Sequence, residues 1–544
     1  MAGVEYGIRV TFPGGTQVKA RLFRCFAQGL IYSAFLLLSL LVGRLLAQDF
    51  RVTEIHAVQD GVELGFQSST SAYYQVWASD CLTGEWTVIR GMTLGAEETQ
   101  SWLDSGIINQ VNGLFYRVRR VPLDQPLDED GDGIDDVYEL RYPILDPLNP
   151  SDANADPDSD GLDNLDEYSY NTDPTQSDTD GDDMADGWEV GHGFDPTDDA
   201  DMMSDPDADG FGNVYEYAHG TDPTNATSFP SPTIIVDPNG GAGSGGGKGG
   251  SGRGGGGGAQ QKSFTCIQDA LDAATNQYEI IQLSDGVYTG ERNKNLVFPG
   301  QPVMLISTNG PENCVIDLGG EGRGVSFIGA EDRRWVLRGV TICNGRAGAI
   351  YILDSSPSLQ YLHITNNKAI YNYGSEQWGN GGGIQINGGS PLLENCRIEA
   401  NLAPHGSGGG IYCMNGAEPW IENTLLADNQ AERGGSAIGC VGSAPRIVNC
   451  TIVDCVSGSG AAGVVADEGS VLFIENSIIW SNGVQQISAS SATVTYSCVQ
   501  GGYAGSGNIS ADPKLTSDYH LKEDSPCIDA GSPSNAPPRD ADGE

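Results

Sequence analysis

The stretch GGGIQINGGSPLLENCRIEANLA, residues 381–403, contains three short apolar runs that are separated by glycine or asparagine. Ile384 and Ile386 alternate with polar residues, and Cys396 and Ile398 do the same further along. Alternation with a period of two is typical of strands that bury one face. The stretch therefore predicts three short strands joined by tight turns.

Four further copies of this pattern form a repeat. They occupy residues 347–369, 408–431, 434–457 and 461–483. The marker positions Pro357, Pro391, Pro419, Pro445 and Val471 are 34, 28, 26 and 26 residues apart. Three short strands per copy at this period predict a solenoid whose coils stack as a parallel β-helix. The insertion IYNYGSEQW, residues 370–378, lengthens the first period.

Two columns of asparagine accompany the repeat. The first consists of Asn395, Asn423, Asn449 and Asn476, and the second of Asn367, Asn401, Asn429 and Asn482, interrupted by Cys455. Asparagine tolerates a left-handed backbone, and stacked amides bond from one coil to the next. We expect the first column to occupy turns and both columns to be structural.

On these repeats and columns, residues 262–544 resemble the right-handed parallel β-helix proteins of the pectin lyase-like superfamily. The run SFTCIQDALDAATN, residues 263–276, has apolar residues at helical spacing and predicts a short helix that caps the first coil. The segment SPCIDAGSP, residues 525–533, is similar to the end segment of bacterial β-helix surface proteins. The resemblance implies a chain that continues beyond Glu544.

The chain is strongly acidic, and the charge is concentrated in one region. The 544 residues include 73 Asp plus Glu against 28 Lys plus Arg, a formal charge of −45. Between Asp128 and Asp222 there are 31 acidic residues and one basic residue, Arg141. Such an excess repels nucleic acid and anionic membrane surfaces and favours cations.

Read in windows of twelve residues, the acidic region repeats four times. Oxygen-bearing side chains recur at positions 1, 3, 5, 9 and 12. They are Asp128, Asp130, Asp132, Asp136 and Glu139 in the first loop, Asp156, Asp158, Asp160, Asn164 and Glu167 in the second, Asp178, Asp180, Asp182, Asp186 and Glu189 in the third, and Asp205, Asp207, Asp209, Asn213 and Glu216 in the fourth. Position 6 is glycine except in the third loop, where Asp183 stands.

This spacing matches the needs of Ca²⁺, which takes about six to eight oxygen ligands from alternate side chains, one backbone carbonyl and a final bidentate glutamate. Position 7 would supply the carbonyl, from Ile134, Leu162, Met184 and Phe211. The alternative is a solvated acidic linker, which predicts no common register. We therefore predict calcium as the cofactor, with the third loop the least regular site.

Four loops of this kind are compatible with EF-hands, dockerin-like repeats or a rod organised around calcium. Pro126, Pro157 and Pro206 argue against long flanking helices. The motif TDPT at Thr172 and Thr221, and FDPT at Phe194, punctuate the loops. On these motifs residues 124–228 resemble thrombospondin type 3 repeats of exported bacterial proteins, which implies calcium binding and, more loosely, cell adhesion.

Two further segments complete the predicted organisation. Residues 49–121 contain short alternating runs and predict a small antiparallel β module, sandwich-like, with Tyr74, Trp77, Trp86 and Tyr116 in its core rather than in a ligand platform. Residues 239–258 are rich in glycine and predict a flexible linker between two independent halves. The predicted fold class is thus mainly β and multidomain, ending in the β-helix solenoid.

The N-terminus has the layout of a secretory signal. Lys19, Arg21 and Arg24 precede the apolar run GLIYSAFLLLSLLVG, and Ala47 is a candidate cleavage position, so residues 1–47 predict a signal peptide. The alternative is an uncleaved anchor. No later run has the 18 or more apolar residues of a membrane helix, so we expect a mature chain without a membrane span, secreted or at the cell surface.

The β-helix offers two candidate sites. Tyr351, Gln385, Asn387, Tyr412 and Trp420 predict a shallow platform for sugar rings, against a purely structural packing of aromatic residues. Glu394 and Glu422, with Arg397 nearby, would stack on neighbouring coils and are the residues to expect if the chain were a glycosidase. No other acid and base converge on the predicted strand face, so the prediction assigns no catalytic residue.

Together these features predict an exported, calcium-binding, multi-module surface or matrix protein. A spacer stiffened by calcium would present a β-helix that binds polysaccharide or a cell-surface glycan, or mediates adhesion. The rival hypothesis is a polysaccharide lyase or glycoside hydrolase acting on uronate-rich polysaccharide. A third possibility is a purely structural adhesin.

Overall fold

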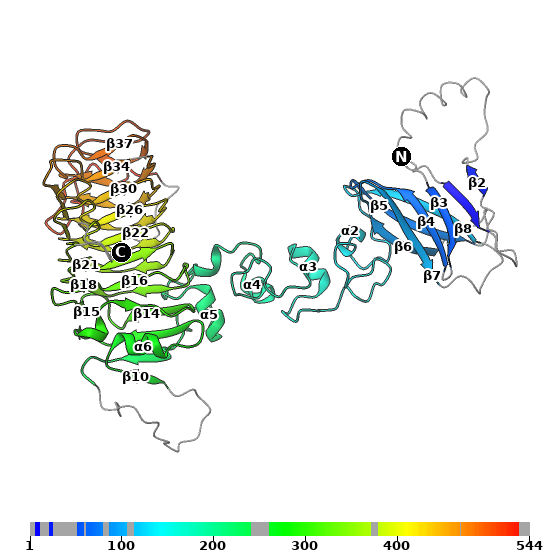
Figure 1. Cartoon of the computed structure of the whole chain (residues 1–544), viewed down its shortest axis with the longest axis horizontal. Helices are drawn as coiled ribbons and strands as arrows, with labels where there is room; N and C mark the ends of the chain where they lie inside the picture. The colour runs from blue at the N-terminus through cyan, green and yellow to red at the C-terminus, as the bar shows by residue number, and fades with distance from the viewer. Residues whose placement is uncertain are drawn as a thin grey trace, which may run out of the picture. The chain divides into compact units, whose positions relative to one another are not determined.

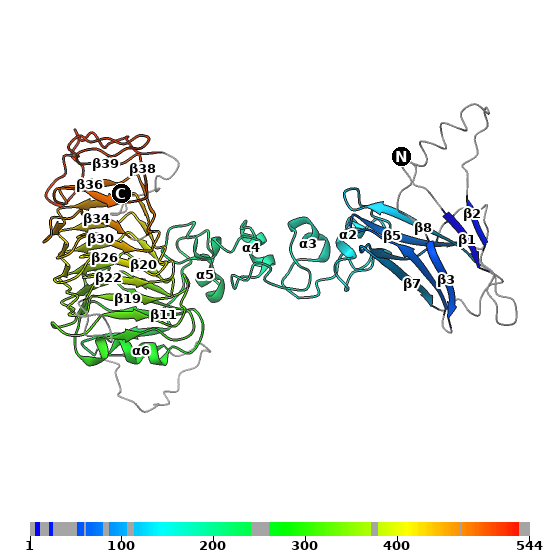
Figure 2. The same ribbon diagram turned by 45° about the horizontal axis from the view of Figure 1, so that its top comes forward.

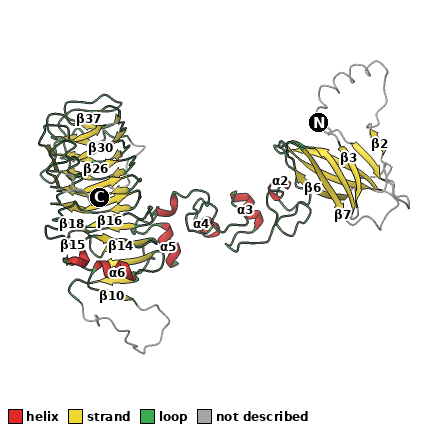
Figure 3. Ribbon diagram, viewed as in Figure 1, coloured by secondary structure: helices red, strands yellow, loops and turns green. Residues whose placement is uncertain are grey.

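The computed structural model describes residues 6–10, 21–24, 52–58, 61–79, 86, 88–105, 114–240, 261–370, 379–467 and 469–532. It separates into two compact units, Met1–Ser204 and Asp205–Glu544 (Figure 1). Strands dominate both units, which confirms the mainly β fold class (Figure 3). None of the helices in the described ranges is long and apolar enough to cross a membrane.

The first unit begins with two antiparallel sheets. One has the order β3 (Val52–Val58), β4 (Gly61–Gln67) and β7 (Thr99–Ser105), and the other has the order β2 (Arg21–Arg24), β1 (Tyr6–Val10), β8 (Leu114–Pro122), β5 (Ala72–Ser79) and β6 (Val88–Leu94). Leu64 and Phe66 of one sheet share a buried cluster with Tyr74 and Tyr116 of the other. The predicted sandwich and the core positions of these two tyrosines are confirmed.

Strands β1 and β2 fall within the predicted signal peptide, whose other residues lie outside the described part of the chain. β1 pairs with β8 along its whole length. Cleavage after Ala47 would remove both strands and leave β8 as an edge strand. The signal peptide stays a prediction.

Each acidic loop leads into a short helix that begins at position 9. The helices are α2 (Asp136–Glu139), α3 (Asn164–Tyr170), α4 (Asp186–His192) and α5 (Asn213–His219), and a 3-10 turn, η1 (Asp201–Met203), follows α4. The last three helices end at a left-handed residue, Asn171, Gly193 or Gly220. The helix at position 9 brings the glutamate at position 12 back over the loop.

Most of the second unit is built from three parallel sheets (Figures 1 and 2). The first sheet has the order β10 (Lys262–Phe264), β9 (Ile234–Val236), β11 (Glu279–Leu283), β14 (Val303–Ser307), β17 (Val336–Arg338), β20 (Ser358–Gln360), β23 (Leu392–Glu394), β27 (Trp420–Glu422), β31 (Arg446–Val448), β35 (Leu472–Glu475) and β38 (Ala492–Thr495). The second has the order β12 (Gly286–Tyr288), β15 (Cys314–Asp317), β18 (Thr341–Cys343), β21 (His363–Thr365), β24 (Arg397–Glu399), β28 (Leu425–Ala427), β32 (Thr451–Val453), β36 (Ile478–Trp480) and β39 (Cys498–Val499). The third has the order β13 (Leu296–Val297), β16 (Val325–Phe327), β19 (Ile350–Leu353), β22 (Ile384–Asn387), β26 (Ile411–Met414), β30 (Ile438–Val441), β34 (Val464–Asp467) and β37 (Ile487–Ala489). A fourth, smaller parallel sheet has the order β25 (Leu402–Ala403), β29 (Gln430–Ala431) and β33 (Val456–Ser457).

Stacked aliphatic residues and asparagines hold these coils together. Ile364, Ile398, Leu426, Ile452 and Ile479 occupy equivalent places in successive strands of the second sheet and are completely buried. The first asparagine column has the predicted left-handed backbone, with φ of 52° at Asn395, 49° at Asn423, 54° at Asn449 and 51° at Asn476. In the second column Asn367 donates to Asn401 and Asn401 donates to Asn429, each at 3.1 Å. Both columns are structural, as predicted.

The helix α6 (Ile267–Ala273) packs Ile267, Ala270 and Leu271 into the core of the first coil, which confirms the predicted cap (Figure 2). A short 3-10 turn, η2 (Glu291–Asn293), follows β12. The Asn293 side chain accepts a hydrogen bond from the Ile267 backbone at the start of α6. The cap is therefore tied to the coil that it covers.

The prediction that the glycine-rich run separates two independent halves is wrong. β9 precedes the glycine run and pairs with β10 and β11, which follow it. Residues 241–260 themselves lie outside the described ranges, but they connect two strands of one sheet rather than two separate halves. The β-helix therefore includes residues 234–236, earlier than predicted, and the fourth acidic loop belongs to the same unit.

Candidate calcium sites

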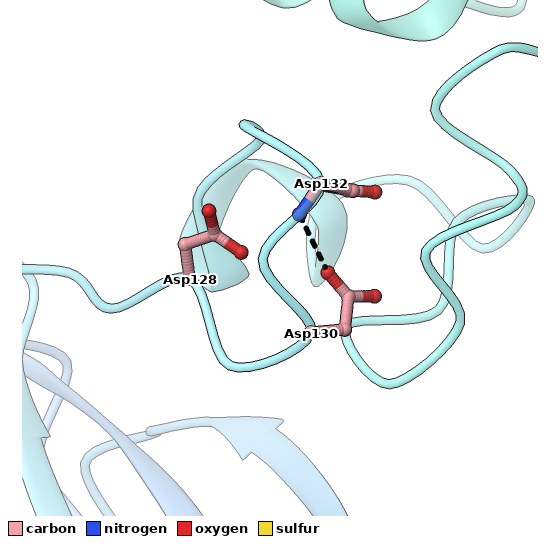
Figure 4. Close-up of side chains that lie close together, drawn as sticks. All are labelled: Asp128, Asp130 and Asp132. Carbon is pink, nitrogen blue, oxygen red and sulfur yellow. Dashed lines mark hydrogen bonds between the residues drawn. The ribbon is translucent and has the colours of Figure 1, made fainter.

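The first aspartate of each acidic loop fixes the turn through its own carboxylate. Asp128 accepts hydrogen bonds from the backbone of Gly131 at 2.6 Å and Gly133 at 3.2 Å. Asp132 donates its backbone N–H to Asp130 Oδ1 at 3.3 Å (Figure 4). Asp156 and Asp178 accept the equivalent bonds from positions 4 and 6, and Asp205 accepts bonds from positions 5 and 6. Each loop is thus folded with its first three aspartates close together.

Position 6 needs a left-handed backbone in every loop. Gly133, Gly161 and Gly210 have φ of 104°, 107° and 102°. Asp183 adopts φ of 77° at the equivalent place in the third loop, which costs energy for a residue with a Cβ. The irregular third loop therefore keeps the loop geometry of the others.

The glutamate at position 12 is buried in all four loops. The exposed fraction is 1% for Glu139 and 0% for Glu167, Glu189 and Glu216. Neither carboxylate oxygen of any of the four has a hydrogen-bond partner among the described residues. A buried carboxylate without a partner is strongly destabilising, so each glutamate needs a cation or a proton.

Aspartate oxygens converge on the same places. Asp130, Asp132 and Asp128 can each place one oxygen within 4.8 Å of the others, and the same holds at Asp156, Asp158 and Asp160 and at Asp178, Asp180 and Asp182. Asp130 Oδ2 and Asp132 Oδ2, at positions 3 and 5 of the first loop, are buried and have no hydrogen-bond partner within the described part of the chain. Hard carboxylate oxygens in this number suit Ca²⁺, and the residues present fit that ion.

The aspartates at position 9 also accept hydrogen bonds within the protein, and their ligand role stays a prediction. Asp136 accepts from the Tyr73 hydroxyl at 2.7 Å and from the Glu129 backbone at 3.0 Å. Asp186 accepts from the Thr179 backbone at 2.8 Å and hydroxyl at 2.6 Å. Asn164 donates to the Asp152 carbonyl at 2.6 Å. The side-chain oxygen of Asn164 is buried and has no partner among the described residues, so it remains available to an ion.

Three further carboxylates reach the loops from later in the chain. Asp152 lies with Asp132 and Glu139 in one group whose oxygens are within 4.8 Å, and Asp186 lies in the same way with Asp160 and Glu167. The charge of Asp201 raises the pKa of Asp182, after the larger effects of burial and nearer aspartates. Sequence reasoning missed these roles.

A weak sequence signal marks two of the three. Asp152 and Asp201 each stand six residues after the aspartate of a DP turn, Asp146 or Asp195, and accept a hydrogen bond from its backbone. The other oxygen of Asp152 is buried and has no partner within the described ranges. The turn therefore aims a carboxylate back at the preceding loop.

Substitution of Asp152 by Asn is predicted to weaken calcium binding at the first loop by about tenfold, because the site loses one charged oxygen ligand. The change leaves an amide that still accepts the Asp146 backbone bond. Calorimetric titration would measure the affinity. Asp199→Asn, an exposed change of the same charge, should leave it unaltered, and equal weakening in both variants would contradict a ligand role for Asp152.

The ion-free glutamates have raised pKa values. Burial is the main cause, followed by the charges of neighbouring aspartates, and it raises the pKa of Glu139 and Glu189 to about 9. The pKa of Glu167 rises to about 8 and that of Glu216 to about 7, again mainly through burial. Without a cation, these groups hold protons near neutral pH.

Calcium binding is therefore predicted to strengthen as pH rises from about 6 to 8, by up to about tenfold per unit at each loop, because the ion displaces the glutamate proton. The folded ion-free state binds more protons than the unfolded chain, so without calcium its stability should rise as pH falls below about 9. Titrations in buffers of different ionisation enthalpy would count the released protons. An affinity independent of pH would contradict the prediction.

On the β-helix, Glu394 and Glu422 are register partners, side by side on the neighbouring parallel strands β23 and β27. Burial raises the pKa of both, and the charge of Glu422 adds to the rise at Glu394. Gln360 donates to Glu394 at 3.1 Å. Arg397 is not beside them, contrary to prediction, because it lies on β24 of the second sheet and bonds Glu399 at 2.7 Å.

The predicted sugar platform is brought together only in part. Tyr351, Gln385 and Tyr412 align in register on β19, β22 and β26 of the third sheet, and Asn387 lies two residues beyond Gln385. Trp420 is separate from them, since it lies on β27 of the first sheet with the Arg446 guanidinium 4.7 Å from its ring centre. The turn between the two sheets explains this separation.

Comparisons with known proteins agree with the repeat. A family model described as a right-handed β-helix region matches residues 323–499. A crystal structure of pectate lyase Pel9A is similar at 17% identity, with 56% of this chain and 94% of that chain covered and a TM-score of 0.30. No curated protein matches. The pectate lyase likeness is too low to bear on activity, but the family match and the three parallel sheets agree that residues 323–499 form a right-handed β-helix region.

Proposed function

We propose that this is an exported calcium-binding protein of the cell surface or extracellular matrix, in which calcium orders an acidic spacer next to a β-helix. One observation carries the calcium assignment: four glutamates in the same register are buried with no partner for either oxygen among the described residues. A cation in each loop supplies the missing partner. The predicted thrombospondin type 3-like repeats fit this role.

Calcium has a structural task in this proposal. The apolar clusters of the acidic region are small: one consists of Ile134, Tyr138, Leu145 and Ala153 with three partly buried neighbours, and Val137 packs with Tyr73 and Val121 of the β module. Segments with so little core fold stably when a metal contributes the binding energy. Ion binding would therefore turn the repelling carboxylates into an ordered spacer.

Terbium luminescence tests the assignment. Tyr138 and Trp188, at position 11 of the first and third loops, stand next to the glutamates and would sensitise a bound Tb³⁺ ion. Emission should appear on addition of Tb³⁺ and fall on addition of Ca²⁺. Magnesium should displace Tb³⁺ poorly, because it demands a smaller octahedral site. Failure of Ca²⁺ to displace Tb³⁺ would refute the calcium sites.

A second candidate function is binding of a polysaccharide or cell-surface glycan by the β-helix, with adhesion as its consequence. Its support is the row of Tyr351, Gln385 and Tyr412 across three coils of the third sheet. The half-buried rings of Tyr351 and Tyr412 suit stacking against sugar rings, whereas the Gln385 side chain between them is buried. Affinity electrophoresis in gels that contain a glycan should show retardation that is lost in Tyr351→Ala and Tyr412→Ala, and retardation that is unchanged in both would refute this surface.

The enzyme alternative is a lyase or hydrolase of uronate-rich polysaccharide. Its support is the Glu394 and Glu422 pair, with raised pKa values and facing positions on neighbouring strands. Incubation of the protein with such polysaccharides, followed by assays for unsaturated products and reducing ends, would test it. Activity that Glu394→Gln abolishes would establish the enzyme and displace the binding proposal.

A further inference from the structure

The fourth acidic loop is packed against the β-helix. Tyr215, on α5 directly before the glutamate of position 12, is completely buried. Its hydroxyl donates to the Arg334 carbonyl at 2.6 Å, and its ring meets Tyr278 edge-on at 5.2 Å. Val214 beside it is also completely buried. The helix that carries Glu216 is thus seated on the β-helix by its own side chains.

Arg338 makes a second contact between the loop and the sheet. It lies at the end of β17 and donates from its guanidinium to the Gly210 carbonyl at 2.6 Å. The guanidinium also lies 4.8 Å from the centre of the Tyr361 ring on the next coil. A Cβ at position 210 would meet the guanidinium at 2.5 Å, so glycine is needed both for this approach and for its φ of 102°.

The predicted ligands of the fourth loop and the residues that contact the β-helix are neighbours in sequence. Gly210 separates Asp209 from the carbonyl-bearing Phe211, and Asp205 accepts the Gly210 N–H at 2.8 Å. Tyr215 immediately precedes Glu216. A change in the loop backbone on ion loss would therefore move the two groups that touch Arg338 and Arg334.

We propose that calcium in the fourth loop is a structural clamp for the β-helix. The inference rests on the calcium binding proposed above. The ion fixes the loop in the conformation that engages Arg338 and seats Tyr215, and the coils around β17 and β20 gain stability from it. An ion that binds only this loop conformation stabilises it by RT ln(1 + c/Kd), which grows with the calcium concentration c.

Amide hydrogen exchange of the full chain tests the clamp. At a calcium concentration ten times the dissociation constant, exchange at β17 and β20 should slow by about tenfold relative to the chelated protein. Glu216→Gln should abolish this protection. Glu189→Gln, the matched change in the third loop, should leave it intact. Protection that survives Glu216→Gln, or that Glu189→Gln removes equally, would overturn the clamp.

Arg338→Gln keeps the test decisive if Glu216→Gln fails to fold. This variant leaves every loop ligand in place and removes the charged contact to Gly210. It should bind as many calcium ions as the unmodified protein in calorimetry but lose most of the calcium-dependent protection at β17 and β20. Full calcium binding in the unmodified protein with no effect on exchange would refute the clamp alone, whereas no calcium binding would refute the proposed function as well.

Discussion

Chelation of calcium is expected to unfold the acidic spacer while both β domains remain folded. Trypsin would report this directly, because Arg141 is the one basic residue between Asp128 and Asp222. Cleavage after Arg141 should accelerate by about tenfold to a hundredfold on chelation, since removal of the ions leaves the four glutamates buried without partners.

Two controls make the proteolysis specific. Cleavage after Arg433, an exposed residue of the β-helix far along the chain from the loops, should change much less than cleavage after Arg141. Magnesium at the same concentration should not restore protection. Cleavage after Arg141 at the same rate with and without calcium would show that the spacer does not depend on the ion.

Glu167→Gln should cost the chain one calcium ion. The amide has no charge and cannot chelate through two carboxylate oxygens, so the second loop is expected to bind at least about a hundredfold more weakly. Calorimetry would show one fewer site, and proteolysis at Arg141 should accelerate at low calcium, because α3 packs on the first loop through Tyr168 and Tyr138.

Asp166→Asn is the matched control for that variant. Asp166 is the adjacent residue on the same helix, and its side chain is exposed and is not among the predicted calcium ligands. The variant should retain every calcium site. Loss of a site in Asp166→Asn, or full retention in Glu167→Gln, would remove position 12 from the ligand set.

The repeat made the β-helix predictable, because each coil fills its interior with residues that are local in sequence. Ile384, Ile386 and Ile398 alternate with polar neighbours, and all three are completely buried. The first asparagine column was predictable for the same reason, since a left-handed turn needs a particular residue at a fixed place. The sandwich core of Tyr74 and Tyr116 followed from alternation alone.

What the sequence could not reveal depends on contacts between distant segments. Asp152 and Asp201 approach their loops only after a helix and a DP turn have reversed the chain. The pairing of β9 with β11 spans the glycine-rich segment, whose composition resembles a domain linker. Trp420 and Tyr412 are eight residues apart, yet a turn between them places the two rings on different sheets.

Calorimetric titration of the purified, chelator-treated chain with calcium tests the central claim most directly. Four loops in one register predict the uptake of several ions per chain, about one for each loop, with protons released near neutral pH. The absence of any calcium uptake up to millimolar concentrations would contradict the account.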